Sequence, residues 1–128
     1  MEPTTYVIVE PGAQRPPTGG RAFVAHEGES LSALFERVER SAAARGGPSV
    51  LHLELGPDAS ALALDARSRL LGTLAGSLPE GYGRLVLAAP AGRALWMAQA
   101  LAEWIRRSRG AVPVTVEVIE RSAFARAA

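Results

Sequence analysis

The sequence predicts one α/β domain over residues 1–128, built from a single layer of four to five mostly parallel strands packed with three main helices. Strand-like and helix-like segments alternate along the chain, and this alternation favours right-handed crossovers between parallel strands. The segment RLVLAAP at 84–90 is apolar without interruption, which is typical of a strand buried on both faces at the centre of a sheet. Two successive strands at the amino end predict an antiparallel element there.

The amino-terminal part of the chain predicts two strands joined by a long loop. TYVIV at 5–9 and AFVAHE at 22–27 contain the β-branched and aromatic residues that strands favour. The stretch between them, 10–21, combines proline and glycine without any periodicity. It therefore predicts a loop or a flexible joint.

The next predicted element is a helix that begins after Ser30, because serine is a favourable amino-terminal cap. Its apolar residues recur at helical spacing, and Gly46-Gly47-Pro48 predicts where it ends. The segment VLHLEL at 50–55 then alternates, so it predicts a strand with one apolar face and one semi-polar face. The apolar positions of the helix are Leu31, Leu34, Phe35, Val38 and Ala42.

A second helix is expected over roughly 62–78, where leucines recur at helical spacing. PEGYG at 79–83 predicts the turn that leads into the apolar strand 84–90.

A third helix is expected within 91–110, followed by a strand in VPVTVEVIE at 112–120. Pro113 lacks the backbone N–H that an inner strand donates, so it predicts that this strand lies at an edge or begins there. The tail 121–128 is expected to form a last short helix.

The composition excludes several classes of protein. The chain has no cysteine, which excludes disulfides and thiolate metal sites. A net charge of +1 gives no basic field for nucleic acid, so nucleic acid is not an expected partner. The amino end lacks the basic region of a secretory signal, and no run of about 18 apolar residues predicts a membrane span. We therefore expect a cytoplasmic protein.

Both tryptophans of the chain lie on the predicted helix within 91–110. The apolar residues of this helix cover one broad arc, and Trp96 points nearly opposite to it, with Trp104 about 80° away at the border. Because tryptophan and arginine are enriched at binding hot spots, this side predicts a docking surface for a protein partner or for a second copy of the chain. We call it the Trp/Arg face, and it consists of Arg93, Trp96, Ala100, Trp104 and Arg107.

An alternative interpretation leaves no docking surface on this helix. In that case the chain itself covers Trp96, with its carboxyl-terminal tail or with the 10–21 loop, and Trp104 borders the core.

Two loops, 56–60 and 89–93, predict a different kind of site, for a small anionic ligand such as a nucleotide. Ligands of open α/β sheets bind beyond the carboxyl ends of the strands, where loops lead into helix amino ends. Neither loop has the spacing of a P-loop or of G-x-G-x-x-G, so an ordinary turn with a solvated Arg93 is the competing interpretation. The candidate contacts are Gly56, Asp58, Ser60, Ala91, Gly92 and Arg93.

Polar residues interleaved with the predicted strands offer a third alternative, a small enzyme with acid/base or metal chemistry. His26 and His52 are its centre, with Glu54 and Glu117 as further candidates. This chemistry requires the two histidines to converge in the fold. No G-x-S-x-G is present, and we assign no catalytic residue, no metal ligand and no cofactor.

The element order over residues 22–128 resembles that of the STAS domain and the SpoIIAA-like family. The segment VLHLELGPDASALALDARSRLL at 50–71 corresponds to the strand, loop and helix start at which that family carries a phosphorylatable serine. The family's Asp-Ser-Ser/Thr-Gly pattern reads Asp-Ala-Arg-Ser at 65–68 here, and the loop offers Ser60. The resemblance implies a small STAS-like regulatory fold without catalytic machinery.

A second resemblance covers LVLAAPAGRALWMAQALAEW at 85–104 and the strand VTVEVIE at 114–120. Together they look like the Rossmann-like half of CARF and SAVED nucleotide sensors. This resemblance implies that the loop 89–93 faces a cyclic nucleotide.

Overall fold

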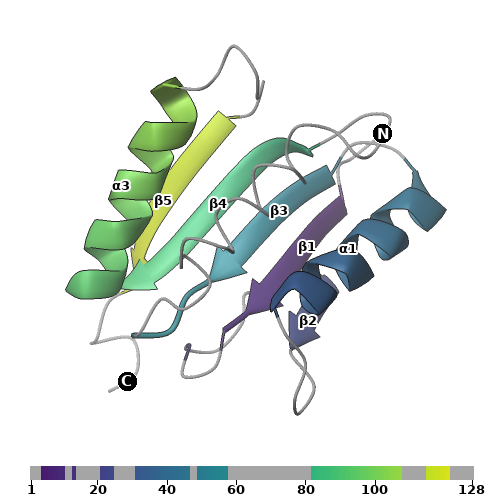
Figure 1. Ribbon diagram of the computed structural model, residues 1–128, viewed down its shortest axis with the longest axis horizontal. Helices are drawn as coiled ribbons and strands as arrows, with labels where there is room; N and C mark the ends of the chain where they lie inside the picture. Colours follow the sequence, from purple (N-terminus) through teal and green to yellow (C-terminus); the bar gives the residue numbers. More distant parts are fainter. Residues whose placement is uncertain are drawn as a thin grey trace.

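The computed structural model describes residues 4–10, 13, 21–24, 31–46, 49–57, 82–107 and 115–121. Within these residues the chain forms one sheet and two helices (Figure 1). The strands are β1 (Thr4–Val9), β2 (Arg21–Val24), β3 (Ser49–Glu54), β4 (Tyr82–Pro90) and β5 (Thr115–Arg121). The helices are α1 (Leu31–Arg45) and α3 (Arg93–Arg107).

All neighbouring strands of the sheet are parallel, in the order β2-β1-β3-β4-β5. The predicted parallel sheet is confirmed, but the predicted antiparallel element at the amino end is wrong, because β2 pairs with β1 in parallel. A parallel neighbour needs a connection of roughly a dozen residues, and residues 10–20 provide that length. For the direction in which β2 pairs with β1, the length of the stretch between the two strands therefore matters more than its proline and glycine content.

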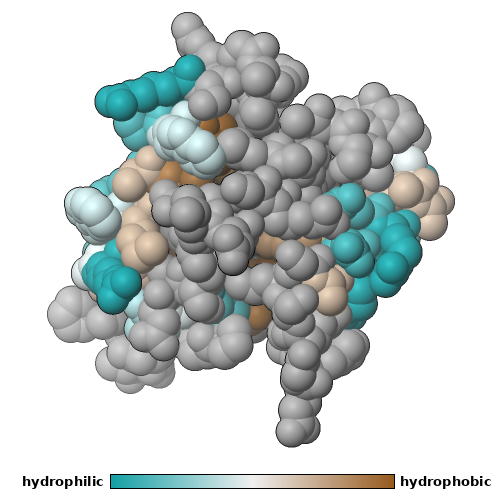
Figure 2. All heavy atoms as spheres, in the orientation of Figure 1, coloured by the Kyte–Doolittle hydropathy of each residue, from teal (hydrophilic) through white to brown (hydrophobic). Residues whose placement is uncertain are grey.

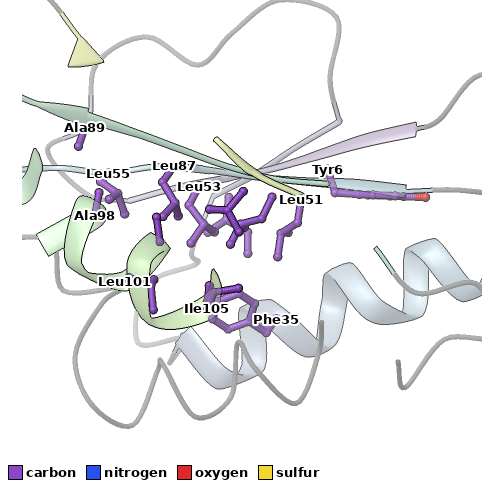
Figure 3. Close-up of a cluster of buried hydrophobic side chains, with 14 of the residues drawn as sticks. Tyr6, Phe35, Leu51, Leu53, Leu55, Leu87, Ala89, Ala98, Leu101 and Ile105 are labelled. Atoms are coloured by element: carbon purple, nitrogen blue, oxygen red, sulfur yellow. The ribbon is translucent and has the colours of Figure 1, made fainter. Parts of the chain in front are cut away.

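One face of the sheet carries the hydrophobic core, and both described helices pack on it (Figure 3). The connections β2-α1-β3 and β4-α3-β5 cross the sheet in the same direction, and right-handed crossovers then place their helices on the same face. The strands alternate, so every second residue of each strand points to this core. The buried strand residues of the core are Tyr6, Ile8, Leu51, Leu53, Leu55, Leu85, Leu87, Ala89 and Val116.

The helices contribute the apolar positions that their periodicity predicts. α1 buries Leu34, Phe35, Val38 and Ala42 and ends at Gly46, whose φ of 72° is a left-handed conformation that glycine adopts without strain. The Gly46 N–H donates to the Ala42 carbonyl at 2.9 Å. α3 buries Ala94, Ala98, Leu101, Ala102 and Ile105, with Leu95 and Met97 partly buried against the same core.

β4 is an inner strand that is buried on both faces, as its apolar run predicts. Residues 85–89 are all buried, and Val86 and Ala88 point away from the helix-covered face. The strand begins at Tyr82, two residues earlier than expected, and its register shifts opposite Ser49 and Val50. Gly83 is the additional residue at this irregularity, a common position for glycine within a strand.

β5 lies at the edge of the sheet, as predicted. Arg121 belongs to this strand, paired with Pro90, and not to a tail helix as expected.

Several predictions concern segments outside the described residues. These are the helix over 62–78, residues 25–27 of the second strand, Pro113 and the tail after Arg121. The structure therefore bears on two of the three expected helices. In the described part of the chain, no helix combines the length and the apolarity needed to cross a membrane.

Candidate functional site

The Trp/Arg face of α3 is exposed over its whole length. Trp96 exposes 69% of its surface and Trp104 exposes 42%, and these are the exposed large hydrophobic side chains of the described residues. Arg93, Ala100 and Arg107 are exposed as well. The structure thus places all five predicted residues of this face in solvent and on the same side of one helix.

The position of α3 in the fold explains this exposure. The helix packs against β4 and β5 at one end of the sheet, whereas α1 lies at the other end (Figure 1). Its buried arc consists mainly of alanines with Leu101 and Ile105, so the core is complete without either tryptophan. In the space-filling view, this side of the molecule shows hydrophilic side chains next to paler and more hydrophobic ones (Figure 2).

The two arginines at the carboxyl end of α3 differ in whether they are bonded to the sheet or exposed to a partner. Arg106 Nη2 donates to the Val116 carbonyl at 3.1 Å, which ties the end of α3 to β5. Arg107 Nε lies 3.7 Å from Glu103 Oε1, with both side chains more than half exposed. An exposed pair of this kind contributes on the order of 0.5 kcal/mol. Arg107 therefore remains available at the surface.

The carboxyl edge of the sheet holds the second candidate region. β1 connects to β2, its neighbour towards one edge of the sheet, whereas β3 connects to β4, its neighbour towards the other edge. Ligands of α/β sheets bind where the direction of these connections reverses, and here that point lies between the carboxyl ends of β1 and β3. Here the Glu10 N–H donates to the Glu54 carbonyl at 2.9 Å, and the Gly56 N–H donates to Glu10 Oε1 at 2.8 Å. Gly56, one of the predicted anion contacts, therefore already donates its N–H to a carboxylate of the chain itself.

The loop between β4 and α3 ends at the same edge of the sheet as Gly56. Ala91, Gly92 and Arg93 are exposed, and Gly92 has a φ of 106° that side chains rarely adopt. The Gly92 carbonyl accepts a 3.0 Å hydrogen bond from the Trp96 N–H and so begins α3. The other predicted anion contacts, Asp58 and Ser60, lie outside the described residues.

A buried charged cluster lies on the face of the sheet opposite α1 and α3. Glu54 is fully buried, and its two carboxylate oxygens accept hydrogen bonds of 2.8 Å from Arg121 Nε and Nη2. His52 Nε2 donates to Glu54 Oε1 at 2.9 Å. Ala88 on β4 pairs with Glu54 in register, and its small side chain lets Arg121 reach from β5 across β4 to β3. We call His52, Glu54 and Arg121 the buried cluster.

Charge is balanced within the buried cluster. Burial alone would raise the pKa of Glu54, but the hydrogen bonds from Arg121 and His52, together with the positive charge of Arg121, lower this pKa below its ordinary value of 4.5. The hydrogen bond to Glu54 in turn raises the pKa of Arg121. An ionised Glu54 that already accepts three hydrogen bonds is suited to joining strands, and it has little basicity left for proton transfer.

The predicted acid/base residues do not all meet in this cluster. His52 and Glu54 are in contact, whereas Glu117 forms an ion pair with Arg84 in which both side chains are more than two-fifths exposed. His26 lies outside the described residues, so the required convergence of the two histidines stays a prediction. Among the described residues, no group of His, Asp and Glu is arranged to hold a metal ion.

Sequence reasoning recognised His52 and Glu54 as polar strand residues but missed Arg121. The available signal was the pattern itself: a carboxylate between apolar residues of an inner strand needs a cationic partner when it is buried. The pattern does not say which of the 14 Lys and Arg residues provides it.

Comparison of the chain with protein-family models, with curated proteins and with solved structures gives no match. The resemblances to STAS domains and to nucleotide sensors therefore stay predictions.

Proposed function

We propose that this chain is a protein-interaction module that binds its partner through the Trp/Arg face of α3. The observation that carries the proposal is Trp96, which exposes 69% of its surface on a helix whose core arc is complete without it. A large aromatic side chain in that position adds nothing to the core. It contributes hydrophobic free energy when another surface covers it.

The exposed area indicates how much Trp96 contributes to binding. A tryptophan side chain buries roughly 150–250 Å² when it is fully covered. Covering the exposed 69% of Trp96 then removes roughly 100–170 Å² from water. At about 25 cal/mol per Å², this contributes about 3–4 kcal/mol, the range of an interface hot spot. Trp104, with 42% exposed, adds a smaller share.

The two alternative functions have less support from the described residues. An anion sensor at the strand ends loses one of its predicted contacts, because Gly56 donates its N–H to Glu10, and keeps the exposed Ala91, Gly92 and Arg93. An enzyme centred on His52 requires its second ring nitrogen, Nδ1, to reach a substrate, but His52 is only 7% exposed and its Nε2 donates to the fully buried Glu54. The anion alternative has a direct test, because nucleotides or phosphorylated metabolites that bind would raise the melting temperature of the chain.

The two tryptophans provide a direct probe of the proposal, because they are the two indoles of the chain. Incorporation of 5-fluorotryptophan gives one ¹⁹F signal from each, and the variants W96F and W104F assign them. We expect both signals to shift or broaden when the chain is placed in an extract of its source cells, or when its own concentration is raised.

The control for this experiment is the variant W96A. Its remaining signal, from Trp104, is expected to keep the position of the isolated monomer under the same conditions. Signals of the unsubstituted chain that stay at the monomer position both in extract and at high concentration would overturn the proposal.

A further inference from the structure

We draw no further inference here: the strongest candidate, the exposed surface patch formed by the Trp/Arg face of α3, belongs to the site already described, and nothing in the described part of the chain shows what covers it.

Discussion

Removing Arg121 from the buried cluster tests how the ends of β3 and β5 are joined. In the variant R121A, the carboxylate of Glu54 loses two hydrogen bonds of 2.8 Å while it remains fully buried. Breaking a buried ion pair by removing one partner costs about 3–5 kcal/mol, because the remaining charge is left without compensation. The lower end, about 3 kcal/mol, applies here because 29% of the Arg121 side chain is exposed and water reaches the pair from that side.

The assay is urea and thermal unfolding at pH 7. For a domain of this size, a loss of about 3 kcal/mol lowers the melting temperature by about 10 °C. The matched control is R84A, which removes a guanidinium from the same face of the sheet but at the other end of the strands, where Arg84 pairs with Thr115. Arg84 and its partner Glu117 are 51% and 41% exposed, so this variant is expected to cost less than about 1 kcal/mol.

The dependence on pH identifies the carboxylate as the cause. The pKa of Glu54 is lowered in the folded wild type, so its contribution to stability is present above pH 4.5 and is lost as the pH falls through the lowered value. Without Arg121, burial has the larger influence and the pKa of Glu54 rises. The difference in unfolding free energy between the wild type and R121A should therefore shrink as the pH falls from 7 to 3. A cost of R121A no larger than that of R84A, or a difference that is the same at both pH values, would refute this reasoning.

Three further tests, one with a single variant and two with a pair of variants, address separate parts of the fold by urea unfolding. Tyr6 Oη is buried without a hydrogen-bond partner among the described residues, so Y6F is expected to leave the unfolding free energy unchanged or raise it by about 1 kcal/mol; a loss of 1 kcal/mol would indicate a partner. G92A is expected to cost about 1–2 kcal/mol because of its φ of 106°, although its position is open, whereas G83A, also open, costs less; equal costs would contradict this. W96A is expected to change stability by less than about 0.5 kcal/mol, whereas L101A, at a residue only 2% exposed, loses about 3 kcal/mol; a large loss in W96A would mean that the chain itself packs on this tryptophan.

The residue pattern within each segment predicted the individual helices and strands well, because the formation of each depends mainly on residues of that segment. Helical spacing of apolar residues and the Gly46 stop gave the position of α1, and the uninterrupted apolar run gave the inner strand β4. The predicted antiparallel direction of β2 was wrong. The direction in which two strands pair depends on how far the connecting chain reaches, and the periodicity of apolar residues does not encode that length. The early start of β4 was missed because Tyr82 and Gly83 resemble turn residues in the sequence, although Tyr82 pairs with Ser49 of β3 and Gly83 continues the same strand.

The Trp/Arg face and the buried cluster also differ in how far the local sequence pattern predicts them. The direction of Trp96 away from the core follows from helix geometry alone, because it depends only on positions within α3, whereas its 69% exposure had to come from the structure. The buried cluster depends on the strand order, since Glu54 and Arg121 are 67 positions apart and meet only when β4 lies between their strands. Its geometry also requires a small residue at Ala88, whose role is visible only once the register is known.

The most direct test of the Trp/Arg face as an interface is site-specific cross-linking from its centre. The chain has no cysteine of its own, so A100C introduces a single thiol at the centre of the Trp/Arg face, and A44C introduces one at an exposed position of α1. A photo-reactive group attached to the thiol at position 100 is predicted to form covalent products with a protein of the source cells or with a second copy of the chain, whereas the same group at position 44 forms few. Equal yields at the two positions would contradict the Trp/Arg face as the interface.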